Sequence, residues 1–152
     1  MNGPPKKILV ATDGSADSVL AARRAVELAH SFGSELCVVH VVSMTQPYHI
    51  FGEVLVEAPS LYEEDMHSAQ EILDEQVRTI EEAGGKITEA YLEKGEPDAR
   101  VISLAEEIGA GLIVVGSRGQ NPLKRLPIGS VSSSIVTHAH CEVLVVRGEE
   151  RD

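Results

Sequence analysis

Short apolar runs alternate with helix-like stretches along the chain of 152 residues. The first run, Ile8-Leu9-Val10-Ala11, lies in a predicted strand over 6–12 and is apolar on both faces, as expected of a central strand in a parallel sheet. Further strands are predicted at 35–42, 88–92, 112–115 and 143–146, and helices at 16–32, 61–83, 97–108 and 130–138. This order predicts an α/β fold: an open five-stranded parallel sheet with helices on both faces and right-handed connections.

The composition favours a single domain, residues 1–152, with an aliphatic core. The chain has two Phe, three Tyr and no Trp, and its pI is near 4.9. Few aromatic rings and an acidic surface argue against nucleic acid as a partner. No apolar run approaches the roughly 18 residues of a membrane span, and the N-terminus lacks a signal-peptide core. We therefore expect a cytoplasmic protein without membrane contact.

The cysteines and histidines predict neither a disulfide nor a metal site held by protein ligands. Cys37 and Cys141 lie in or beside apolar segments, where buried reduced thiols are expected. His138, His140 and Cys141 are close in sequence but supply only part of a ligand set.

The stretch 43–60 is interpreted as the least regular part of the chain. It contains Pro47, Gly52 and Pro59 and is long for a loop in a compact domain. Loops of this length serve as lids or partner contacts, or are disordered.

The segment from Gly116 to Ser134 carries the clearest chemical signal. It follows a predicted strand and leads into a short helix that begins near Gly129-Ser130. The first turn of a helix offers free N–H groups and the positive end of the dipole, which suit an anion, and glycine lets a ligand approach the main chain. Basic side chains in the same segment of a protein with net charge -11 favour phosphate; they are Arg118, Lys124 and Arg125.

Simpler interpretations of these residues remain open on the residues alone. Gly129-Ser130 could be only a turn and a helix N-cap, and Asp13 could be only the N-cap of the first helix. The segment also matches neither common nucleotide loop. Gly84-Gly85-Lys86-Ile87 lacks the first glycine and the hydroxyl of the Walker pattern, and no GxGxxG is present.

Asp13 and Gly116 are predicted to lie near each other although about a hundred residues separate them. Asp13 follows the first predicted strand, and Gly116 follows the fourth. If the first strand is central, successive strands are added to one side of it and then to the other. The strand order therefore reverses between the first and fourth strands. A crevice then opens at their carboxyl ends, where open α/β sheets bind ligands.

The chain resembles the ATP-binding universal stress proteins. The spacing Gly116-x2-Gly119-x9-Gly129-Ser130 matches the nucleotide motif of that family. The similarity continues through residues 8–15, Val39-His40-Val41, residues 112–119 and residues 138–147, so it spans nearly the whole chain. The resemblance implies a Rossmann-like sheet of strand order 3-2-1-4-5 and a homodimeric stress-response protein that binds ATP.

The resemblance also implies roles for particular residues. The main chain of Val41 would contact adenine, with Ala11 and Thr12 beside the base, and Asp13 would lie near the ribose or near a Mg²⁺ carried by the phosphates. The remaining implied contacts are made around the ribose and phosphates; the full set of candidate nucleotide-binding residues is Ala11, Thr12, Asp13, Val41, Val115, Gly116, Arg118, Gly119, Gly129, Ser130, Val131 and Ser132. Ala11 departs from the family, in which proline is frequent at this position.

Three functions are weighed for such a protein. The first is a nucleotide-dependent regulatory switch with a protein partner of unknown identity. The second is a slow or partner-activated ATPase, for which Asp13 is the one candidate base in the crevice. The third is a dimeric scaffold without nucleotide, against which the intact glycine motif argues.

The last predicted strand indicates a dimer. Residues Val143 to Val146 form an apolar run at the edge of the predicted sheet. Exposed apolar edges pair readily with another chain, and a symmetric copy would present the same strand. The alternative is that the charged tail covers this strand.

Overall fold

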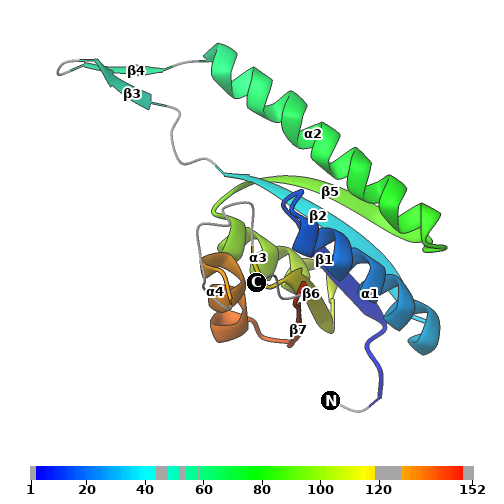
Figure 1. The fold of residues 1–152 in the computed structure, drawn as a ribbon. Helices are drawn as coiled ribbons and strands as arrows, with labels where there is room; N and C mark the ends of the chain where they lie inside the picture. Colours follow the sequence, from blue (N-terminus) through cyan, green and yellow to red (C-terminus); the bar gives the residue numbers. More distant parts are fainter. Residues whose placement is uncertain (1–2, 44–47, 52–53, 58, 119–127, 149–152) are drawn as a thin grey trace.

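The computed structural model describes residues 3–43, 48–51, 54–57, 59–118 and 128–148. A five-stranded parallel sheet forms the centre of the molecule (Figure 1). Its strands are β1 (Lys7–Thr12), β2 (Glu35–Ser43), β5 (Ile87–Gly95), β6 (Leu112–Gly116) and β7 (Glu142–Val146). The spatial order β5-β2-β1-β6-β7 is 3-2-1-4-5 when these strands are counted along the chain, which confirms the expected topology.

Four helices connect these strands and cover both faces of the sheet in the described part of the chain. Their bounds are α1 (Ala16–Phe32), α2 (Pro59–Glu82), α3 (Pro97–Ile108) and α4 (Ser130–His138). Helix α1 begins where the Ser15 hydroxyl accepts the N–H of Ser18, and it ends at Gly33, whose φ of 68° is left-handed. Helix α3 begins with Pro97, which needs no hydrogen bond at that position.

The core lies in two layers, one on each face of the sheet. Side chains of a strand alternate between faces, so Ile8 and Val10 pack beneath α1 and α2, whereas Leu9 packs with Val101 and Leu104 of α3. Both layers are aliphatic, as the composition predicted. The alternation continues to the carboxyl ends of the strands, so successive side chains there also lie on opposite faces of the sheet.

The stretch 43–60 contains a hairpin that we did not predict. Strands β3 (Tyr48–Phe51) and β4 (Val54–Glu57) pair in antiparallel fashion, so the expectation of an irregular stretch was wrong. The runs 48–51 and 54–57 are rich in β-branched and aromatic residues, which favour strands, and only two residues separate them. Figure 1 shows the hairpin away from the main sheet, beside the start of α2.

Strand β5 extends further than expected. The prediction ended it at residue 92 and assigned Lys94-Gly95 to a turn, but Val42 pairs with Lys94 and Ser43 with Gly95. Polar residues are tolerated here because β5 is an edge strand with a solvent-exposed face. The consequence is that β2 and β5 continue together past the end of β1.

Candidate functional site

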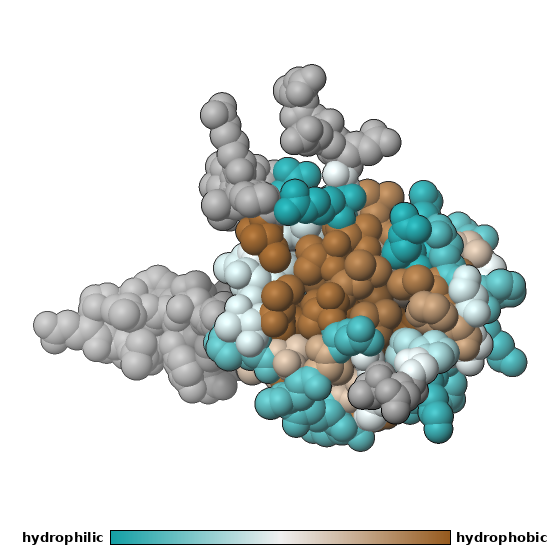
Figure 2. Space-filling view, turned by 90° about the horizontal axis from the view of Figure 1, so that it is seen from below, coloured by the Kyte–Doolittle hydropathy of each residue, from teal (hydrophilic) through white to brown (hydrophobic). Residues whose placement is uncertain are grey.

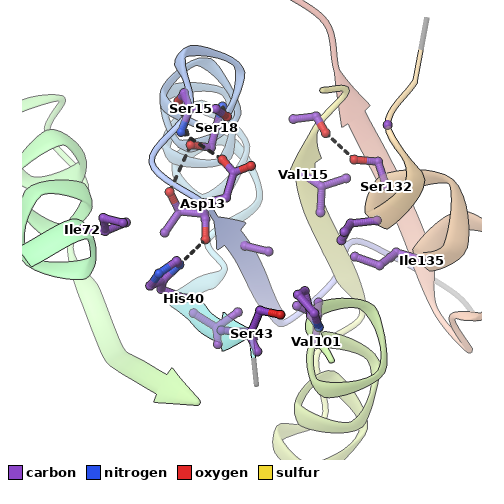
Figure 3. A pocket seen from close by; sticks show the side chains of 18 of the residues that line it. Asp13, Ser15, Ser18, His40, Ser43, Ile72, Val101, Val115, Ser132 and Ile135 are labelled. Carbon is purple, nitrogen blue, oxygen red and sulfur yellow. Dashed lines mark hydrogen bonds between the residues drawn. The ribbon is translucent and has the colours of Figure 1, made fainter. Parts of the chain in front are cut away.

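A cavity of about 850 Å³ lies at the carboxyl ends of β1, β2 and β6. Strand β1 pairs with β2 only as far as Thr12 opposite His40, so β1 ends before β2 does and, in the described part of the chain, does not reach Val41. The walls come from both faces of the sheet and from the starts of α3 and α4 (Figure 3). The crevice predicted between the first and fourth strands of the sheet is therefore present.

One side of the cavity has apolar walls. Val41 and Ala11 lie at the strand ends, Val101 comes from α3, and Val115 and Ile135 come from β6 and α4. Val115 is 4% exposed and Ile135 is 0% exposed, so these walls are fixed parts of the core. Such a surface suits a flat, largely apolar ring.

The opposite end of this side is the N-terminus of α4. Gly129 is the N-cap residue and has no side chain, and no side-chain cap bond is present there. Its own N–H donates to the carbonyl of Ser117 at 2.5 Å. The N–H groups of Ser130, Val131 and Ser132 occupy the first turn, where a helix supplies no acceptor. The helix therefore presents backbone donors and the positive end of its dipole to the cavity.

The hydroxyl of Ser132 is already used within the protein. It donates to the carbonyl of Gly116 at 2.5 Å and ties the first turn of α4 to the end of β6. Ser132 is 7% exposed. Ser132 can therefore offer an anion its backbone N–H but not its hydroxyl proton.

Asp17 holds the chain where it leaves β6. Its carboxylate Oδ2 accepts the hydroxyl of Ser117 at 2.8 Å and the backbone N–H of Arg118 at 3.2 Å. The Nε of Arg118 lies 3.6 Å from the same oxygen, and the carbonyl of Arg118 faces the Ser15 hydroxyl at 3.4 Å. Our sequence reasoning missed Asp17 and Ser117. The sequence features that could have identified them are an acidic residue in the first turn of α1 and a serine next to Gly116.

Gly116 lies against the backbone of α1. A Cβ at Gly116 would stand 2.7 Å from the carbonyl carbon of Asp17 and 2.9 Å from its oxygen. Glycine is thus required here for the packing of β6 on α1, whatever ligand occupies the cavity. This physical requirement was not foreseen from the sequence.

The end of β1 is held by a local network. The Thr12 hydroxyl donates to Ser18 Oγ at 3.0 Å and accepts the N–H of Gly14 at 3.2 Å. Asp13 Oδ1 accepts the N–H of Ser15 at 2.9 Å. The carboxylate of Asp13 therefore shapes the turn before α1, but the N-cap of α1 is Ser15, so the simpler interpretation of Asp13 as the N-cap was wrong. Asp13 also lines the cavity.

The structure brings eleven of the twelve predicted site residues together around the cavity; they are Ala11, Thr12, Asp13, Val41, Val115, Gly116, Arg118, Gly129, Ser130, Val131 and Ser132. Gly119 lies outside the described residues, as do Lys124 and Arg125. Residues contributed by α2 and α3 were not predicted, because nothing local in the sequence marks which turn of a distant helix meets a strand end.

A hydrogen bond joins α4 to α3 behind the cavity. The Ser134 hydroxyl donates to Asp98 Oδ2 at 2.6 Å. This hydrogen bond is the largest cause that lowers the pKa of Asp98, and the charge of His138 adds to it. The bond fixes the position of α4 relative to α3, whose Pro97 and Val101 also line the cavity.

The other titratable groups of the described residues form no metal site. Within the described ranges, no cluster of three or more His, Cys, Asp or Glu could hold a metal ion. Burial raises the pKa of the Cys37 and Cys141 thiols. Cys37 is buried as expected, whereas the expectation that Cys141 is buried was wrong, because it is only half-buried. None of the helices in the described part of the chain is long and apolar enough to cross a membrane.

Comparisons with known proteins agree with the fold. A sequence model of the universal stress protein family matches residues 4–147. A curated Staphylococcus aureus (strain USA300) relative, which carries that family's name, is 39% identical over 146 residues, covering 95% of this chain and 86% of the relative. A universal stress protein structure from Lactobacillus plantarum has a TM-score of 0.81 at 26% identity, covering 96% of this chain and all of that one.

A third similar protein is the universal stress protein from Archaeoglobus fulgidus, whose structure was solved in complex with dAMP. It has a TM-score of 0.67 at 27% identity and covers 95% of this chain and 98% of its own. The family match over nearly the whole length, the close sequence relative and the shared fold lead to one conclusion: the chain belongs to the universal stress protein family.

Proposed function

We propose that this protein binds an adenine nucleotide, ATP in particular, and acts as a nucleotide-dependent dimeric regulator of the stress response. The observation that carries the proposal is the cavity, which has an apolar slot at one end and uncapped helix N–H groups at the other. A nucleotide has this same polarity, with a flat base at one end and phosphates at the other. The dAMP complex of the Archaeoglobus fulgidus relative supports the choice of adenine.

In this proposal the base lies between the end of β2 and the side chains of α3 and β6. The β1–β2 ladder ends at His40, so among the described residues the main chain of Val41 has no β1 partner and can bond to a base edge. Ala11 and Val115 line the same part of the cavity. The ribose would lie over Thr12 and Asp13.

The phosphates would lie at the start of α4. Backbone donors come from the turn Gly129 to Ser132, and Arg118 adds a positive charge at the cavity wall. Asp17 shares that charge, so Arg118 is held in place but partly neutralised. A Mg²⁺ bound to the phosphates could be coordinated by a carboxylate oxygen of Asp13, because Mg²⁺ prefers carboxylate ligands.

The dimer would form through β7. Figure 2 shows a broad hydrophobic area on the underside of the molecule, where β7 lies in Figure 1. Strand β7 is an edge strand, and residues Val143 to Val146 are only half-buried. A symmetric copy would pair its own β7 there and cover the apolar surface.

The site and the dimer edge meet at one residue. The N–H of Ser117 donates to the carbonyl of Val146 at 2.8 Å, and its carbonyl accepts the N–H of Gly129. Ordering of the phosphate site can therefore act on the end of β7, which is the physical basis we propose for a switch.

Nucleotide carried by freshly purified protein tests the proposal. We expect heat-released material to contain an adenine nucleotide, and calorimetric titration of the emptied protein to show that ATP binds and adenosine binds much more weakly. GTP is the control for the base. Binding of no nucleotide would favour a scaffold role instead, and rapid Mg²⁺-dependent ADP production by the protein alone would favour an enzyme.

A further inference from the structure

The cavity extends beyond the proposed nucleotide site, around the end of the sheet and onto its other face. We call this part the α2-side lobe; its walls are Ser18, His40, Val42, Ser68, Ala69 and Ile72. Figure 3 shows His40 and Ile72 across the strand ends from Val101, Val115 and Ile135. None of the six is among the residues assigned to the base, ribose or phosphates above.

His40 offers an unused hydrogen-bond acceptor in this lobe. The residue is 8% exposed, and its Nδ1 lies 2.8 Å from the carbonyl of Thr12. A carbonyl only accepts, so Nδ1 carries the proton and, in the neutral ring, Nε2 presents a lone pair. No hydrogen bond joins Nε2 to any described residue, and no described side-chain nitrogen is both fully buried and unpaired. Nε2 therefore opens on the cavity.

The other buried polar groups of the lobe are already paired. Ser18 Oγ accepts from Thr12 and donates to the carbonyl of Ser15 at 2.8 Å. The amide of Gln76 donates to the carbonyl of Ser18 at 3.0 Å. Ala69 is 3% exposed, and Val42 and Ile72 add apolar surface. The lobe thus combines apolar walls with an acceptor at His40 and the hydroxyl of Ser68.

The two ends of the cavity have opposite hydrogen-bonding character. The α4 end offers N–H donors and attracts an anion, whereas the lone pair of His40 attracts a donor and repels an anion. A groove of about 310 Å³ adjoins the lobe at Ser68 and Ile72, and Glu71 and Glu75 line it. Both carboxylates are exposed and ion-paired, Glu71 with His67 and Glu75 with Arg78, so they disfavour phosphate on this side only weakly.

We propose that the α2-side lobe binds an uncharged ring bearing an N–H donor, such as the second base of a dinucleotide whose phosphates lie at α4. The inference rests on the proposed nucleotide function and adds a ligand class to it. The cavity volume of about 850 Å³ is near the upper end of ligand pockets, which span roughly 300–1,000 Å³. A mononucleotide placed as above leaves this lobe unfilled.

Calorimetric titration with ADP and with diadenosine pyrophosphate tests the proposal. Both ligands carry a pyrophosphate, and only the second has another adenosine. We expect the wild-type protein to bind diadenosine pyrophosphate about tenfold more tightly, since one hydrogen bond and an apolar contact are added. Ser68→Phe, which places a ring in the lobe, is expected to remove this gain and leave ADP affinity unchanged. Gln70→Phe, at an exposed position of the same helix, is the matched control.

Nitrogen-15 spectra of His40 provide a readout that a general loss of fold would not mimic. We expect the free protein to show the Nδ1-protonated tautomer and the Nε2 resonance to move on addition of diadenosine pyrophosphate but not of ADP. ADP binding with no gain for the larger ligand, or a gain that survives Ser68→Phe, would overturn the lobe assignment alone. Failure of both ligands to bind would overturn the proposed nucleotide function and this inference together.

Discussion

At the residue scale, the site depends on close approaches that few side chains permit. Asp17 connects α1 to the chain leaving β6, and Gly116 lets those two elements touch. Ser132 and Ser134 point to different partners, one to the end of β6 and the other to α3. Together these contacts hold the first turn of α4 without using its backbone donors.

Gly116→Ala is expected to destabilise the protein by about 1–3 kcal/mol. The added Cβ would meet the backbone of Asp17 at 2.7 Å, and backbone cannot move aside as a flexible side chain can. Urea unfolding followed by circular dichroism measures the change. An alanine variant as stable as the wild type would show that β6 and α1 do not approach this closely.

Ser134→Ala is expected to cost about 0.5–1.5 kcal/mol at neutral pH through loss of the bond to Asp98. The pKa of Asp98 is lowered in the folded state, so its contribution to stability is present above the unfolded pKa, near 3.9, and is lost as the pH falls through the lower folded value. The stability difference between wild type and variant should therefore shrink in acid. A carbon-13 titration of the Asp98 carboxyl should show its pKa rising in the variant; an unchanged pKa would contradict the assigned cause.

At the scale of elements, helix α4 is the part on which the proposed chemistry depends. It is a helix of nine residues with a glycine N-cap, and its first turn faces the cavity. Most α-helices of a globular domain are stabilised by packing and capping alone. Here the buried Ile135 supplies the packing, and the N-terminus, which has a glycine N-cap without a side-chain hydrogen bond, is where we propose that the phosphates bind.

Ser130→Asp is expected to change stability and affinity in opposite directions. A carboxylate at the first turn interacts favourably with the helix dipole and should stabilise the protein by about 0.3–1 kcal/mol. The same charge should repel the phosphates and lower ATP affinity at least about tenfold. Calorimetry and thermal unfolding measure the two effects. Thr137→Asp, at the other end of α4, is the control, and it should lose stability but keep its ATP affinity. Equal ATP affinity in the two variants would show that the phosphates do not bind at the start of α4.

The order of elements could be predicted from the sequence, whereas the wall contributed by α2 could not. Apolar runs such as 8–11 and 112–115 are continuous because central parallel strands are covered on both faces, so their positions follow from local pattern. The glycine spacing likewise indicated the site. Helix α2 reaches the cavity through Ser68, Ala69 and Ile72, and that contact depends on how a long helix packs across β2 and β5. The hairpin was missed because Pro47, Gly52 and Pro59 suggested a loop, although the runs 48–51 and 54–57 consist of residues that favour strands.

In the molecule as a whole, the β5 edge of the sheet is polar and solvent-exposed, whereas the β7 edge is apolar. Strand β5 ends the sheet with exposed polar residues, whereas β7 ends it with four half-buried aliphatic residues, Val143 to Val146. Exposed Val131 and Val136 of α4 add to the apolar surface of the protein. We therefore expect self-association at β7 and none at β5.

Val145→Lys is expected to convert the proposed dimer to a monomer. A lysine on β7 places a charge where the partner strand would pair, and desolvating that charge opposes association. Sedimentation velocity gives the mass, and circular dichroism establishes that the variant is folded. Thr88→Lys on β5 is the control and should leave the dimer intact. A folded Val145→Lys variant that remains dimeric would exclude this edge.

We propose above all that backbone donors at the start of α4 bind the phosphates of a nucleotide. Its most direct test follows the backbone amide resonances of Ser130, Val131 and Ser132 while ATP, or adenosine as control, is added. We expect these resonances to move downfield with ATP and to stay in place with adenosine. Saturating ATP that shifts resonances elsewhere in the protein but leaves these three unchanged would contradict it.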